Sequence, residues 1–130
     1  MTLEEYDAKV SEMGERLRAH WDEDLYDELN DYQYEHMQEF LKEYGKTIGN
    51  SPAKKVCFDL LYYAVHDSKS GSSIMDVKSK KLADEVKEII MNEIGQYLLD
   101  PPEIYQYGDS WSIDCMFAGN YIPFWDGWRE

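Results

Sequence analysis

The sequence predicts an α+β fold in which about three helices are followed by a small C-terminal three-stranded antiparallel meander. Over most of residues 1–100, apolar residues recur at three- and four-residue steps, which is the period of an amphipathic helix. After residue 102 the period changes to two, as in a half-buried strand. A chain of 130 residues has the size of one domain. We therefore expect a single domain, helical over residues 1–100 and a meander over residues 103–126.

The first helical segment is predicted from residue 3 to residue 44. Its apolar and aromatic residues stay in phase from Leu3 to Tyr44, which fits one long helix or two collinear helices. A break near residues 20–24 is the alternative, because Asp22 or Asp24 is a suitable N-cap for a second helix. The glycines that follow Tyr44 end the segment.

The second helix is predicted to begin at Ser51 and Pro52. Serine favours the N-cap position, and the first helical position does not need the N–H group that proline lacks. The apolar face that follows is broad, so we expect this helix to lie centrally in the fold and to end near residues 66–68.

The third helix is predicted to begin between Ser73 and Ser79. Before it, residues 68–73 (SKSGSS) have the composition of an exposed loop. The sequence Asp100-Pro101-Pro102 ends this helix, because proline cannot continue the hydrogen-bond ladder and restricts the residue before it.

The strand with the clearest pattern covers residues 111–117, where apolar and polar side chains alternate between two turn-like segments. Residues 104–107 and 121–125 are its natural antiparallel partners. Pro123 would place the last strand at an edge of the sheet, because proline cannot donate a ladder hydrogen bond.

The sequence lacks the features of an exported or membrane-spanning chain. Its N-terminus is acidic where a signal peptide is cationic, and no charge-free run approaches the ~20 residues needed to cross a bilayer. We therefore expect a cytoplasmic protein with no membrane partner. Cys57 and Cys115 are accordingly expected to be buried free thiols, with a disulfide or redox pair as the alternative.

Motifs typical of catalysis or metal binding are missing from the sequence. His66-Asp67 lacks a serine flanked by nucleophile-elbow glycines, and Asp22–Asp24 lacks the glycine and closing glutamate of a calcium loop. Gln33 stands where a Glu-x-x-His motif ending at His36 would need glutamate. Since no glycine-rich phosphate loop is present either, we predict that the protein is not an enzyme and uses no metal and no cofactor.

The charge distribution is the most informative property of the sequence. The chain holds 27 acidic residues against 13 Lys and Arg, a formal net charge of −14, which disfavours direct binding to nucleic acid. Residues 22–43 hold nine carboxylates and only one cation, Lys42. Six pairs of these carboxylates stand four residues apart, and each pair destabilises a helix by about 0.2–0.5 kcal/mol. Along a helix, nine charges over 22 residues give one per ~3.7 Å, close to the ~3.4 Å per phosphate of a DNA strand.

We therefore predict a surface for a basic partner protein. Acidic residues steer a cationic partner, and tyrosine and tryptophan anchor interfaces. The predicted contact residues combine one face of the acidic segment with a tyrosine inside it and a tryptophan near the C-terminus: Asp24, Asp27, Glu28, Asp31, Tyr34, Glu35, Glu39 and Trp128.

Three functions fit such a surface. In size, acidity and tyrosine content the chain resembles bacterial immunity proteins, which implies an inhibitor of a basic, nuclease-like toxin domain that blocks the active site or the nucleic-acid groove of the toxin. The first alternative is a phage-type DNA mimic that inhibits a restriction, CRISPR or other nucleic-acid-processing complex. The second is a structural interaction module whose acidity serves only solubility.

Overall fold

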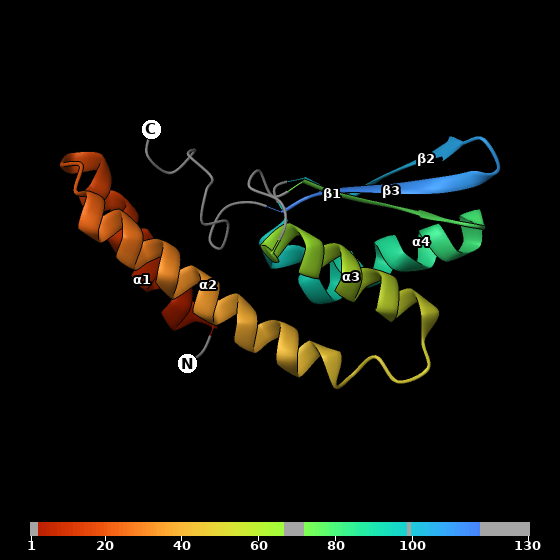
Figure 1. Ribbon diagram of the computed structural model, residues 1–130, viewed down its shortest axis with the longest axis horizontal. Helices are drawn as coiled ribbons and strands as arrows, with labels where there is room; N and C mark the ends of the chain where they lie inside the picture. Colours follow the sequence, from red (N-terminus) through yellow and green to blue (C-terminus); the bar gives the residue numbers. More distant parts are fainter. Residues whose placement is uncertain (1–2, 67–71, 99, 118–130) are drawn as a thin grey trace.

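A computed structural model describes residues 3–66, 72–98 and 100–117 and confirms the α+β class (Figure 1). In these ranges four α-helices and three strands follow in the order α1 (Leu3–Ala19), α2 (Glu23–Gly45), α3 (Pro52–His66), β1 (Ser72–Val77), α4 (Lys80–Ile89), β2 (Glu103–Tyr107) and β3 (Ser110–Met116). A π-helical turn at Ile90–Ile94 and a 3₁₀ turn at Gly95–Tyr97 extend α4. None of these helices combines the length and the apolar character needed to span a bilayer.

The sheet has three antiparallel-paired strands, as predicted, but one of them comes from a different part of the chain. β3 lies in the centre, and β1 and β2 pair with it on either side. The residues of β1 were expected to form a loop and a helix start, whereas the predicted strand 121–125 lies outside the described residues. Since β1 and β2 are both antiparallel to β3, they run parallel to each other, and α4 with its extension connects them.

The first helical segment is an antiparallel hairpin rather than a collinear pair (Figure 1). The break lies at residues 20–22, and Asp22 caps α2 by accepting hydrogen bonds from the N–H groups of Asp24 (3.0 Å) and Leu25 (3.3 Å). The Tyr6 ring of α1 stacks on His36 of α2, with 3.6 Å between ring centroids. The two helices pack face to face because each has one apolar stripe, and folding back buries both stripes at once.

The caps of the next two helices follow the sequence signals. Ser51 accepts a hydrogen bond from the Lys54 N–H at 3.2 Å, and Ser79 accepts one from the Leu82 N–H at 3.1 Å. As expected, α3 is central, because it packs against α2, α4 and β1. Cys57 and Cys115 are buried free thiols, as predicted.

Buried apolar residues of the described ranges form two separate clusters. The larger one joins α3, α4, the inner face of the sheet and the C-terminal half of α2. The smaller one lies inside the α1–α2 hairpin, between residues such as Val10 and Leu29. Helix α2 belongs to both clusters. Gln33, fully buried, lies on its inner face between Leu29 of the small cluster and Met37 of the large one.

Candidate functional site: the acidic face of helix α2

Six predicted contact residues lie on the solvent-facing side of α2. The buried residues of this helix recur at four-residue steps from Leu25 to Leu41 and face α1 and the core. Among the described residues nothing packs on the opposite side, which exposes six carboxylates: Asp24, Asp27, Glu28, Asp31, Glu35 and Glu39. We call this set the acidic face. Over the 16 residues from Asp24 to Glu39 it extends roughly 24 Å along α2.

The carboxylates of the acidic face make no ion pair with another described residue. Among residues 3–66, 72–98 and 100–117, the ion pairs use other acids, namely Glu43, Asp59, Asp84 and Glu93. Like charges thus stand four residues apart on one helix without intervening cations. This arrangement costs the fold stability and leaves the charge available to a partner.

Tyr34, the predicted aromatic contact, adjoins the acidic face and is 40% exposed. Its hydroxyl lies 3.2 Å from His66 Nδ1, and the two rings meet edge to face. Gln38 Nε2 donates to His66 Nε2 at 3.1 Å, and the ring of Tyr62, which is 46% exposed, lies 4.2 Å from the His66 ring. The contacts with α3 hold Tyr34 in one orientation beside the carboxylates.

Trp21 provides a second exposed aromatic group, at the N-terminal end of the acidic face. It is 44% exposed, and its ring lies 5.0 Å from the Tyr26 ring at the start of α2. Neither Trp21 nor Tyr62 was among the predicted contacts, and Trp128, which was, lies outside the described residues. Tyr62 is 28 residues from Tyr34 in the sequence, so no local pattern reveals that they share one surface.

The acidic face combines carboxylates with exposed aromatic rings. Trp21 lies before its first carboxylate and Tyr34 lies alongside Asp31 and Glu35. Such a combination can bind a cationic protein surface. No group of three or more His, Cys, Asp or Glu in the described part of the chain is arranged to hold a metal ion.

Comparison of the chain with protein-family models, curated proteins and solved structures found no match.

Proposed function

We propose that this protein is a small acidic inhibitor that binds a basic partner, most simply an immunity-type protein that neutralises a nuclease-like toxin domain. One observation carries the proposal: the acidic face presents six exposed carboxylates on one helix, unpaired within the described residues, at a cost to helix stability. A fold gains nothing from this arrangement by itself. Positive charges on a partner surface offset the repulsion among these carboxylates and attract them.

In this proposal the two kinds of side chain have different roles. The carboxylates meet Lys and Arg residues of the partner and accelerate association, which slows steeply with added salt. Tyr34, with the rings around His66, supplies contact area that loses water on binding. Inhibition follows from covering the active site or the nucleic-acid groove of the toxin. The inhibitor itself needs no catalytic group, cofactor or membrane, and it works in the cytoplasm.

The first test captures partners from the native host lysate at low salt and identifies what a salt gradient elutes. A basic nuclease is the expected result. The key variant carries Asp27→Asn, Asp31→Asn and Glu35→Gln. The matched control removes three exposed charges elsewhere, by Glu12→Gln, Glu85→Gln and Glu88→Gln. We expect the first variant to lose at least tenfold in affinity and the control to stay within about twofold of the wild type. Equal affinity of both variants would reject the acidic face as the binding site.

The spacing of charge along α2 also favours a DNA mimic as a second candidate. Nine carboxylates over the predicted segment approach the charge spacing of a DNA strand. A mimic spreads its binding energy over many charges, so single reversals such as Asp31→Lys are tolerated, and a large nucleic-acid-processing complex elutes from the column. A dedicated toxin inhibitor instead depends on two or three residues whose loss is severe.

The third function, a structural interaction module, predicts a different binding affinity for the key variant and the same gain in stability. If acidity serves only solubility, neutralising the acidic face leaves partner affinity within about twofold while the stability of the fold rises.

A further inference from the structure

One face of the sheet is uncovered by the described elements. Helices α3 and α4 pack on the inner face, where Ile113 and Cys115 are fully buried (Figure 1). On the outer face, which is open in the described part of the structure, three large side chains are unusually exposed: Ile74 (52%), Tyr105 (41%) and Tyr107 (72%).

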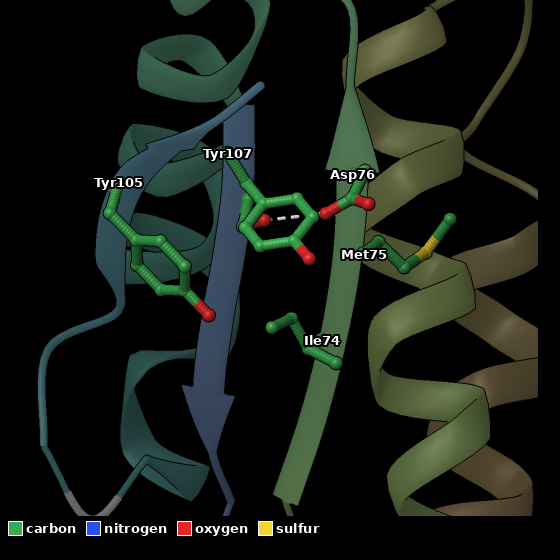
Figure 2. A pocket seen from close by; sticks show the side chains of 6 residues that line it. Ile74, Met75, Asp76, Tyr105 and Tyr107 are labelled. Atoms are coloured by element: carbon green, nitrogen blue, oxygen red, sulfur yellow. Dashed lines mark hydrogen bonds between the residues drawn. The ribbon is translucent and has the colours of Figure 1, made fainter. Parts of the chain in front are cut away.

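The outer face contains a shallow pocket of about 260 Å³. Asp76, Ser112 and Tyr105 form one row across the three strands, in register. Figure 2 shows the two tyrosine rings lying over the sheet, with their hydroxyls directed towards the middle of the face above Ile74. We refer to Ile74, Asp76, Tyr105, Tyr107 and Ser112 as the sheet pocket.

A hydrogen bond holds the carboxylate of the sheet pocket in place. The Ser112 hydroxyl donates to Asp76 Oδ1 at 2.5 Å (Figure 2). Ser112 is only 3% exposed, although its register between Asp76 and Tyr105 places it on the open side of the sheet. Asp76 Oδ2 makes no hydrogen bond with another described residue, so it is available to a ligand.

The charged side chains that the strands place on the outer face are all acidic. Asp76, Glu103 and Asp114 project from it, and residues 72–77, 103–107 and 110–116 contain no Lys or Arg. The Asp114 and Glu103 carboxylates line a smaller neighbouring hollow on the same face. A cation that enters the sheet pocket therefore meets the Asp76 carboxylate, with two more carboxylates in the neighbouring hollow and no like charge from the strands.

We propose that the sheet pocket binds an arginine side chain of a basic polypeptide. A guanidinium group is planar, stacks on aromatic rings and donates fork-like hydrogen bonds to a carboxylate, so it matches two tyrosine rings beside a fixed aspartate better than the more strongly hydrated ammonium of lysine. This site is separate from the acidic face, since it is built only from strand residues.

The test titrates the isotope-labelled full chain with N-acetyl-arginine amide and follows the backbone amide resonances by NMR. We expect saturable shifts at residues 74–76, 105–107 and 112. The citrulline analogue, which is planar but uncharged, should produce much smaller shifts, and the lysine analogue should bind more weakly. Absence of saturable shifts at these residues, or equal shifts with citrulline, would overturn the proposal.

Two variants test whether Asp76 and Tyr107 contribute to binding of the arginine analogue. Asp76→Asn removes the charge while its amide oxygen can still accept from Ser112, and we expect about fivefold weaker binding. Tyr107→Leu removes an exposed ring without opening the core, and we expect a two- to fivefold loss. Glu88→Gln is the control that removes an exposed charge away from the sheet. Unchanged affinity in Asp76→Asn would contradict the assignment.

The same titration separates this inference from the proposed function. The variant with Asp27→Asn, Asp31→Asn and Glu35→Gln should retain arginine binding in the sheet pocket, whether or not it loses a protein partner. Shifts confined to the acidic face would refute the sheet pocket.

Discussion

His36 connects three elements of the fold through one imidazole ring. Tyr6 of α1 stacks on it, and its Nε2 lies 2.8 Å from the hydroxyl of Tyr97, which follows the π-helical turn. Burial lowers the pKa of His36 below its ordinary value of 6.5, although the negative charges of Glu39 and Asp7 act in the opposite direction. The native structure therefore favours the neutral ring.

This preference predicts how stability depends on pH. Because the folded pKa is lowered, the unfolded chain binds a proton at His36 before the folded chain does as pH falls below 6.5. His36 then contributes a loss of stability of up to about 1.4 kcal/mol per pH unit until the folded ring also titrates. We expect the variant His36→Gln to lack this contribution, and the exposed-site control His20→Gln to keep it. Urea unfolding of each protein at pH 7.5, 6.5 and 5.5 measures the difference. Parallel pH profiles of wild type and His36→Gln would contradict the prediction.

At the scale of the element, α2 contains features that stabilise a helix and surface charges that destabilise it. Its N-cap at Asp22 and its apolar stripe favour the helix, whereas its repeated carboxylates oppose it. The same side chains thus make opposite contributions to folding and to the proposed binding.

We therefore predict that removing negative charges from the acidic face raises the stability of the folded protein. Asp27→Asn, Asp31→Asn and Glu35→Gln together remove four like-charge pairs at four-residue spacing, which should raise the free energy of unfolding by roughly 1–2 kcal/mol at low salt. In 1 M NaCl the gain should nearly vanish, because the Debye length falls to about 3 Å. Denaturant unfolding at both salt concentrations provides the measurement. A gain that does not depend on salt, or a net loss of stability, would show that charge repulsion does not govern this helix.

Local signals were sufficient for the elements that depend on neighbouring residues. The caps at Asp22 and Ser51, the strand at Ser110–Met116 and the acidic face all follow from spacings of two to four residues. β1 was missed because it is only six residues long, includes two serines and an aspartate, and gains its strand character from pairing with β3 some 40 residues later.

Local spacing could not predict contacts between segments that are distant in the sequence. The in-phase apolar series of the first 44 residues is the same for a collinear pair and for a hairpin, so it does not fix the direction of the second helix. Likewise, the contact of Tyr34 with His66 and the hydrogen bond from Ser112 to Asp76 join residues 32 and 36 positions apart. The sequence identified the carboxylates of the acidic face and Tyr34 beside them, but neither Trp21 and Tyr62 nor the sheet pocket.

At the scale of the whole molecule, the two apolar clusters differ in size. Within the described part of the chain, eighteen buried residues form the larger cluster, and six form the smaller one inside the α1–α2 hairpin. Between them lies Gln33, a fully buried amide that interacts with the Tyr6 hydroxyl but whose hydrogen-bonding groups are not fully satisfied within the described residues. A buried amide with unsatisfied groups costs about 1–3 kcal/mol, so α2 is weakened at the point where the hairpin joins the rest of the fold.

We therefore expect the hairpin to open before the rest of the molecule does. Hydrogen exchange should be faster in α1 and in α2 up to Gln33 than in α3 and β3, because local opening there exposes only the smaller cluster. The double variant Tyr6→Phe, Gln33→Met replaces both of the buried polar groups that meet here with apolar ones of similar volume, so it should raise the free energy of unfolding by about 1 kcal/mol and slow exchange in the hairpin most. Mass spectrometry of exchanged peptides from both proteins tests this ordering. Equal protection of the hairpin and of α3 in the wild type would show that the two clusters unfold as one cooperative unit. In that case Gln33 would not mark a boundary between them.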